Sequence, residues 1–317
     1  MTGMGFDLTS CALGAGSPCL YATEFQVPNV AIFDNTGTFL SHCNPGGTAY
    51  TAHVESVAVD RVSGIPSIYF GQATPGTPTV IQMDPGCTTI LHTYSPATEG
   101  RGTDWIDLAK DTSDAGLTDI VYSSEGVHLL VFDTATLSQE SNVVIPLAQT
   151  GSALTPDVSG TAISSLPGSS AYALRVLSDG SVAVADTETV VHVDSAGNLL
   201  GSCDGGSAGS GGLFGFNLLP DQNTFATGSF NNGQVDYMTM AHCDANQATP
   251  DFHFNAFQPG QSGFLLGVGI FGEVSQGCGQ NCNSVPEFGL PALMVGAVGL
   301  LAVTLLFKRK SILPIQT

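Results

Sequence analysis

The chain has 317 residues, and its charge is one-sided, with 27 acidic residues against seven basic ones. Before position 290 there are four basic residues, so that part carries a formal charge of 4 minus 27, or −23. Such a surface repels phosphate backbones and anionic lipid headgroups, which excludes nucleic acid as a partner. Helix formers are scarce beside 39 Gly and 17 Pro, and this composition favours an all-β fold.

The N-terminus shows no export signal. Met1–Phe6 have neither a basic start nor an apolar stretch of the kind that signal peptides carry. The far end of the chain predicts a location outside the cell, as argued below, and that location requires such a segment. We therefore expect the natural start to lie further upstream.

A repeated pattern runs through the chain, consisting of an apolar run, an Asp, small residues and a second apolar run. Val30–Cys43 and Val190–Cys203 match best, and weaker copies follow Val80, Leu129 and Val235. The marker position falls at 34, 84, 133, 194 and about 239, a spacing of 45 to 61 residues. Each copy predicts two short strands joined by a tight turn. The turn aspartates are read as turn residues rather than ligands: Asp34, Asp84, Asp133 and Asp194.

Two further strands precede each marker, most clearly at 171–180 and 181–186. Four strands in about 45 to 50 residues are typical of one blade of a β-propeller. The markers predict about five blades. Residues 148–170 leave room for one more, so six blades stay open.

The two ends of this region are predicted to share a blade. Leu20–Phe25 and Val30–Cys43 resemble three outer strands without an innermost one, and Gly263–Glu273 resembles an innermost strand without a blade. Joining them would remove a free sheet edge. We therefore expect a propeller over residues 1–273 that is closed by N- and C-terminal strands.

Eight cysteines form an even set, which indicates disulfides in an oxidising exterior. The pairs closest in sequence are the first candidates, Cys11 with Cys19 and Cys278 with Cys282. No CxxC pair and no His pair with zinc spacing occurs, so no metal site is assigned.

The C-terminus carries the clearest targeting signal. A Gly- and Cys-rich stalk and a Pro-Glu-Phe-Gly sequence fill residues 274–289, and the 18 residues Leu290–Phe307 carry no charge. A helix of that length spans about 27 Å, close to the bilayer core. The basic residues of the tail, 308–317, are expected on the cytoplasmic side. The sequence thus predicts one C-terminal transmembrane helix and an extracellular domain anchored by it.

The chain resembles a known family through Ala97–Ala109, Tyr122–Gly126, Ala171–Leu177 and Phe271–Glu273. These segments look like the secreted NHL/YncE-like β-propellers of prokaryotes. Pro286, Glu287, Phe288 and Gly289 are similar to the archaeal PEF/PEFG variant of the PEP-CTERM sorting tail. The resemblance implies surface export and an archaeosortase-like enzyme that processes the tail.

One face of the propeller is the candidate ligand site, because loops that enter the innermost strands converge there. The candidates are His53, Glu55, Asp104, Trp105, Asp107, Glu125 and Asp186. Calcium-dependent lactonases use several carboxylate oxygens on such a face. The alternative is that these acids cap turns and that the tryptophan packs between blades. Asp104 and Asp107 are three residues apart on one strand, so they are not expected to form a shared pair unless the strand begins between them.

Other motifs carry no chemistry. The chain has no GxSxG sequence of an α/β-hydrolase, and Gly205–Gly212 lacks the Lys-Ser/Thr ending of a phosphate loop. His42, His242 and His253 are read as residues at blade edges.

The sequence therefore predicts a non-enzymatic, surface-displayed propeller that binds an extracellular protein, glycan or small ligand. No cofactor is assigned, although Ca²⁺ stays open. The alternatives are a calcium-dependent lactonase-like hydrolase on the same scaffold and a structural protein of the envelope.

Overall fold

The fold was analysed in a computed structural model. It describes residues 4–7, 19–24, 29–34, 36–44, 53–60, 67–74, 79–99, 101–110, 118–124, 128–139, 143–144, 171–185, 189–194, 199–204, 212–219, 221–231, 233–245, 250–256 and 268. The chain divides into a compact unit, Met1–Cys282, and a second unit, Asn283–Thr317, and all described residues belong to the first.

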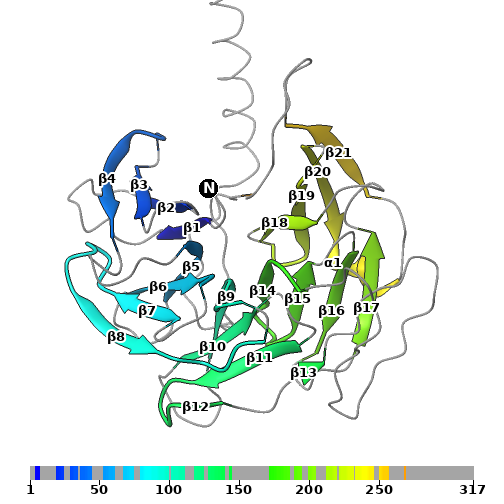
Figure 1. The fold of residues 1–317 in the computed structure, drawn as a ribbon. Helices are drawn as coiled ribbons and strands as arrows, with labels where there is room; N and C mark the ends of the chain where they lie inside the picture. Colours follow the sequence, from blue (N-terminus) through cyan, green and yellow to red (C-terminus); the bar gives the residue numbers. More distant parts are fainter. Residues whose placement is uncertain are drawn as a thin grey trace, which may run out of the picture. The chain divides into compact units, whose positions relative to one another are not determined.

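The described strands form five antiparallel sheets that follow one another along the chain (Figure 1). We name them blades 1 to 5. Blade 1 contains β1 (Met4–Asp7), β2 (Cys19–Glu24), β3 (Asn29–Phe33) and β4 (Phe39–Cys43). Blade 2 contains β5 (Val54–Asp60), β6 (Ser67–Gln72), β7 (Val80–Met83) and β8 (Ile90–Tyr94).

Blade 3 contains β9 (Trp105–Lys110), β10 (Thr118–Ser123), β11 (His128–Asp133), β12 (Ser138–Gln139) and β13 (Val143–Val144). Blade 4 contains β14 (Leu174–Val176), β15 (Val182–Ala185), β16 (Thr189–Val193) and β17 (Leu199–Asp204). Blade 5 contains β18 (Leu213–Leu218), β19 (Thr224–Ser229), β20 (Gln234–Thr239), the helix α1 (Met240–Asp244) and β21 (Phe252–Asn255).

The first strand of each blade lies innermost. β1 contacts β5, β5 contacts β9, β9 contacts β14, and β14 contacts β18. Between blades 4 and 1, Arg175 Nη2 on β14 donates to the carbonyl oxygen of Met4 on β1 at 3.4 Å. This radial arrangement of four-stranded sheets confirms a five-bladed β-propeller within the described part of the chain.

Burial decreases from the axis to the rim. Every residue of β5, β6 and β7 is buried, whereas four of the five residues of β8 and all four of β21 are exposed. Apolar side chains fill the spaces between neighbouring blades. For example, Ile68 and Met83 pack toward blade 1, and Tyr69 and Tyr94 pack toward blade 3. Each blade is therefore stabilised mainly by burial against its two neighbours.

The predicted hairpin turns are confirmed. Asp34 Oδ1 accepts hydrogen bonds from the backbone nitrogens of Thr36 and Thr38, each at 2.8 Å. The Thr36 hydroxyl also donates to this carboxylate, and these bonds hold the pKa of Asp34 below its ordinary value. Gly37 closes the turn with a φ of +79°, as the pattern predicted.

The same turn recurs in blades 2 and 3. Asp84 accepts from the backbone of Gly86 and Thr88, and Asp133 accepts from the backbone of Ala135 and Thr136. Asp194 is described, but the residues that follow it are not. In blade 5 the helix α1 stands where the hairpin turn would be.

The predicted closure of blade 1 by Gly263–Glu273 is wrong. β2 pairs with β3 on one edge and with β1 on the other, so β1 occupies the innermost place. β1 is only four residues long and reads Met-Gly-Phe-Asp, which gives no recognisable alternation. Its Gly5 allows a close approach, since a Cβ there would lie 3.3 Å from the carbonyl oxygen of Val57 on β5.

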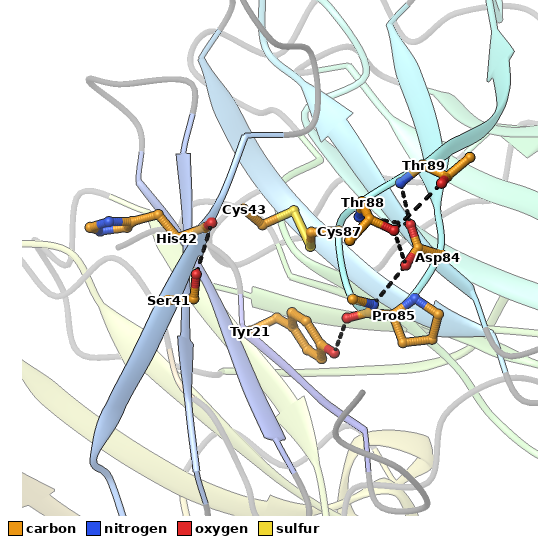
Figure 2. Close-up of a disulfide and its surroundings, with 10 residues drawn as sticks. Tyr21, Ser41, His42, Cys43, Asp84, Pro85, Cys87, Thr88 and Thr89 are labelled. Atoms are coloured by element: carbon orange, nitrogen blue, oxygen red, sulfur yellow. Dashed lines mark hydrogen bonds between the residues drawn. A yellow bond between two sulfur atoms is a disulfide. The ribbon is translucent and has the colours of Figure 1, made fainter. Parts of the chain in front are cut away.

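Disulfides join neighbouring blades at the rim. Cys43 at the end of β4 bonds to Cys87 in the β7–β8 turn of blade 2 (Figure 2). Cys203 on β17 bonds to Cys243 on α1 of blade 5. Tyr21 reinforces the first junction, because its hydroxyl donates to the carbonyl oxygen of Pro85 at 2.8 Å. Each bond thus links the outer part of one blade to the segment that joins the third and fourth strands of the next blade.

Several predictions concern residues that the structure does not describe. Cys19 is disulfide-bonded, whereas Cys11, Cys278 and Cys282 lie outside the described residues. Residues 148–170, the stalk and sorting motif at 274–289, the span Leu290–Phe307 and the tail at 308–317 lie outside them too. In the part of the chain that is described, no helix has the length and apolar character that crossing a membrane requires.

Candidate functional site

Four of the predicted site residues lie where innermost strands begin. His53 precedes β5 and Glu55 is its second residue, while Asp104 precedes β9 and Trp105 is its first residue. Innermost strands of a propeller run in one direction, so these positions share one face of the ring. Glu125 and Asp186 lie outside the described residues.

Arg101 brings two of these carboxylates together. Its Nη2 donates to Glu55 Oε1 at 3.1 Å, and its Nε lies 3.5 Å from Asp104 Oδ2. The Glu55 and Asp104 side chains are 4% and 0% exposed, whereas that of Arg101 is 29% exposed. One partly exposed guanidinium therefore compensates two buried negative charges.

The loop before Arg101 is held tightly between two blades. The backbone nitrogen of Arg101 donates to Ser124 of blade 3 at 3.2 Å, and that of Gly102 donates to Ala73 of blade 2 at 2.9 Å. A Cβ on Gly102 would lie 1.9 Å from the carbonyl oxygen of Gln72, so only glycine fits there. Sequence reasoning missed Arg101 as a site residue, although Gly102 beside a rare basic residue was an available signal.

Asp107 serves a different purpose. Its Oδ2 accepts from the backbone nitrogen of Val176 on β14 at 2.8 Å, and its Oδ1 accepts from Leu108 at 2.9 Å. It is 1% exposed, so it ties blade 3 to blade 4 inside the protein. Asp104 and Asp107 thus have different partners, although β9 begins between them, so alternation along one strand is not the reason.

A small pocket lies among the innermost strands. Residues from all five of these strands line it, including Met4, Val57, Trp105, Arg175 and Phe216. Its volume is about 10 Å³, which is enough for about one water molecule. The Trp105 ring packs beside Phe214 of blade 5, with 6.1 Å between centroids. The tryptophan therefore helps to fill the axis.

Arg175 is the second basic residue near the axis. Its Nε donates to Asn217 Oδ1 at 3.3 Å, and its Nη1 donates to the carbonyl oxygen of Leu174 at 2.8 Å. Asn217 Nδ2 donates in turn to the carbonyl oxygen of Val268 at 3.3 Å. These bonds fix the guanidinium beside the pocket and join β14 to β18.

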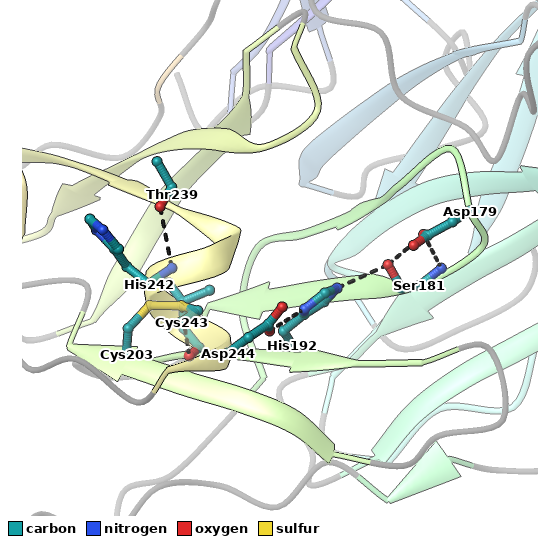
Figure 3. Close-up of polar contacts among 9 residues, drawn as sticks. Asp179, Ser181, His192, Cys203, Thr239, His242, Cys243 and Asp244 are labelled. Atoms are coloured by element: carbon teal, nitrogen blue, oxygen red, sulfur yellow. Dashed lines mark hydrogen bonds and ion pairs between the residues drawn. A yellow bond between two sulfur atoms is a disulfide. The ribbon is translucent and has the colours of Figure 1, made fainter.

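The structure also assembles a Ser-His-Asp set that the sequence did not reveal (Figure 3). His192 Nε2 lies 2.9 Å from Ser181 Oγ, and His192 Nδ1 lies 2.7 Å from Asp244 Oδ1. The three residues come from the start of β15, from β16 and from α1.

The hydrogen bonds have the wrong polarity for a serine nucleophile. A nucleophilic serine donates its proton to the histidine. Here the Ser181 hydroxyl also lies 2.6 Å from Asp179 Oδ1, a carboxylate that can only accept. The hydroxyl proton goes to Asp179, so His192 Nε2 must donate to Ser181. Burial raises the pKa of Asp179, but the hydrogen bonds from Ser181 lower it by more, so the pKa lies below its ordinary value.

Burial leads to the same conclusion. Ser181 is 3% exposed and His192 is 5% exposed, so a substrate cannot reach either group. Blade 2 repeats the arrangement with different residues, since Gln82 Nε2 donates to Ser67 and Tyr94 donates to Gln82, both at 2.9 Å. In both blades a serine at the start of the second strand is hydrogen-bonded to a polar residue of the third strand. This pair is thus a structural link between the two strands.

The described residues include no group of three or more His, Cys, Asp or Glu side chains placed to hold a metal ion. The histidines assigned to blade edges lie there: His42 and His253 are exposed, and His242 Nδ1 lies 2.7 Å from Asp251 Oδ1. The ligand-binding role of the seven candidate residues stays a prediction.

No protein-family model matches the chain, and no curated protein matches its sequence. Among solved structures 932 chains match, so the fold is too widely shared to select a function. One of them, described as the structure of U3-55K, aligns over 83% of this chain and 68% of its own, with a TM-score of 0.53 and 12% sequence identity. At that identity the likeness shows the β-propeller fold alone.

Proposed function

We propose that this propeller is a binding module that meets its extracellular ligand on exposed surface rather than in its axis. The pocket that the described innermost strands line carries the proposal, because its volume of about 10 Å³ is too small for a metabolite. Interlocking blades with loops at both ends also form a rigid frame, and such frames commonly present binding loops.

The competing function is a calcium-dependent lactonase on the face that holds Glu55 and Asp104. Calcium needs six to eight oxygen ligands, several of them carboxylates. Here the guanidinium of Arg101 lies against both of these side chains, so a calcium ion would have to displace it. This arrangement supports binding over hydrolysis.

Calcium titration of the full chain, followed by thermal unfolding, separates the two functions. We expect no rise in Tm at micromolar calcium and no turnover of a panel of sugar lactones. A calcium-dependent rise in Tm that disappears in Glu55→Gln, together with lactone hydrolysis, would replace the binding module with the enzyme.

We propose further that the module is held at the outer face of the cell membrane by Leu290–Phe307. The disulfides Cys43–Cys87 and Cys203–Cys243 support an oxidising exterior. The resemblance to secreted NHL/YncE-like propellers with a PEF/PEFG tail adds processing at Pro286–Gly289 by an archaeosortase-like enzyme.

Mass spectrometry of the C-terminus from native membranes tests the anchor. Processing predicts a mature protein without Lys308, Arg309 and Lys310. An intact tail in the membrane fraction would exclude processing but keep the anchor, and an intact tail in the soluble fraction would exclude both.

A further inference from the structure

Three aromatic rings lie side by side on blade 5, those of Phe252 and Phe254 exposed and that of Tyr237 half-buried. Tyr237 on β20 pairs directly with Phe252 on β21, and Phe254 follows two residues later on the same face. The ring centroids lie 6.2 Å apart for Tyr237–Phe252, 6.2 Å for Tyr237–Phe254 and 6.3 Å for Phe252–Phe254. We call these three residues the aromatic surface.

The aromatic surface stays open where other blades are covered. Phe252 is 60% exposed and Phe254 is 42% exposed. Tyr237 occupies the third-strand place that Gln82 has in blade 2 and His192 has in blade 4. In each blade this third-strand residue pairs with the second-strand residue that lies two positions after the start of the second-strand segment. That segment starts at Thr224 in blade 5, at Ser67 in blade 2 and at Ser181 in blade 4.

In blades 2 and 4 the following blade covers this place. Tyr94, which binds Gln82, packs against Phe132 of blade 3 with 6.0 Å between ring centroids. In blade 4, His192 is hydrogen-bonded to Asp244 from α1 of blade 5. The exposure of the aromatic surface is therefore specific to blade 5 among these three, and large exposed aromatic groups commonly mark binding sites.

Charge identifies the kind of ligand. The chain carries a formal charge of −20, and this negative potential attracts cations and repels anions. Asp251, next to Phe252 in the chain, is already paired with His242 Nδ1 at 2.7 Å, so the attraction for cations is assigned to the charge of the whole chain. Ring faces also attract cations through their quadrupole.

The type of cation follows from hydration. Primary ammonium groups are strongly hydrated, and an open set of rings offers few oxygen acceptors to replace that water. A quaternary ammonium group has no N–H donor and carries apolar methyl groups that pack on ring faces. It therefore suits three rings on a negatively charged protein better than a lysine side chain does.

We propose that the aromatic surface of Tyr237, Phe252 and Phe254 binds a soluble quaternary ammonium compound of the choline or betaine type. The proposal rests on the binding function above and gives it a ligand class and a location. The rings contact the methyl groups, and the net negative charge of the chain favours the cation.

Choline and its neutral isostere 3,3-dimethylbutan-1-ol test the proposal by calorimetric titration of the full chain at constant ionic strength. Choline should bind, and the isostere and methylammonium should bind more weakly. Phe252→Leu and Phe254→Leu keep apolar volume but remove a ring, so each should weaken choline binding about two- to fivefold. Phe39→Leu, at an aromatic residue of blade 1 that is 49% exposed, is the matched control and should change nothing.

Equal binding of choline and the isostere would show an ordinary apolar patch and overturn the proposal. Equal loss in Phe39→Leu would show that choline binds exposed aromatic rings in general, and unchanged binding in Phe252→Leu and Phe254→Leu would show that the net charge attracts cations without a site. Binding of neutral oligosaccharides alone would identify a glycan surface, and each of these outcomes would overturn the proposal. If choline does not bind and lactones are not hydrolysed, the ligand proposal fails but the proposed binding function stands. Lactone turnover with intact choline binding would instead overturn the proposed function and keep the surface.

Discussion

Arg101 is one of four basic residues before position 290, and it lies against two carboxylates that water barely reaches. Taking a carboxylate out of water is costly unless a cation or hydrogen bonds compensate it. The position of Arg101 is therefore a condition for folding of this face.

Replacing Arg101 with Met should lower the free energy of unfolding by about 2–3 kcal/mol. The cost of breaking a fully buried pair is about 3–5 kcal/mol, and the guanidinium here is 29% exposed, which reduces the effect. Urea unfolding at pH 7 measures it.

The triple variant Arg101→Met, Glu55→Gln, Asp104→Asn is the control. It removes the charges that Arg101 compensates, so it should recover most of the loss. A single variant as stable as the wild type would show that these carboxylates do not depend on Arg101.

Asp236 shows the opposite case, a buried carboxylate whose pKa burial raises. It is 2% exposed, and its Oδ2 has no hydrogen-bond partner among the described residues. A folded pKa above the unfolded value means that the ionised group destabilises the fold at neutral pH. That penalty disappears as pH falls through the raised pKa toward and below 3.8, the ordinary value.

Asp236→Asn should therefore raise the free energy of unfolding at pH 7 by about 1 kcal/mol, the scale of a poorly satisfied buried polar group. At about pH 3, where the wild-type carboxyl is protonated, the gain should vanish. Urea unfolding at both pH values checks this, and a gain that persists at pH 3 would assign the effect to packing instead.

At the scale of the element, the hairpins were predictable because their chemistry is local. Asp34 and Gly37 close a turn through contacts within four residues, and that spacing is visible in the sequence. β1 was not predictable, because four residues carry too little pattern to distinguish a strand from a loop.

The site shows the same division between local and distant contacts. Glu55 and Asp104 were assigned to one face from their places around the start of the innermost strands. Arg101, which joins them, and Asp244, which reaches His192 from 52 residues away, depend on contacts between blades. No spacing within one repeat encodes such contacts.

The disulfides join different blades, but their positions follow the repeat and are visible in the sequence. Cys43 and Cys203 occupy the same place, nine residues after the repeat markers Asp34 and Asp194, and each bonds about one repeat further on, at a separation of 44 or 40 residues. Repeat position was thus the available guide to these two bonds. The pairs chosen by nearness in sequence, Cys11–Cys19 and Cys278–Cys282, include residues outside the described part of the chain and stay predictions.

Replacing Cys203 and Cys243 together with Ala should lower the free energy of unfolding by about 2–4 kcal/mol, because the bond closes a long loop in the unfolded chain. The pair Cys43→Ala, Cys87→Ala should lose a similar amount, since its loop is only slightly longer. Urea unfolding without reductant is the measurement. If dithiothreitol destabilised the double variants as much as the wild type, the loss would not come from these bonds.

For the whole molecule, the ring of blades concentrates negative charge on a compact surface. Repulsion among these charges opposes the folded state, and salt screens it over a Debye length of about 10 Å at 0.1 M. The ring thus holds together through interblade burial and two rim disulfides against its own charge.

Raising NaCl from about 0.05 to about 0.5 M should increase Tm at pH 7 by an amount on the order of a few degrees, through screening. Near pH 4.2, the sequence pI, the net charge is close to zero and this rise should disappear. Differential scanning calorimetry at both pH values decides. An equal rise at pH 4.2 would indicate a general salt effect on apolar burial.

The rim disulfides have a consequence for damage by proteases. A protease that cuts any loop between Cys43 and Cys87, or between Cys203 and Cys243, severs the backbone but leaves both fragments covalently joined. The nicked blades stay packed against their neighbours, so a cleaved molecule keeps its surface and separates into pieces only after reduction.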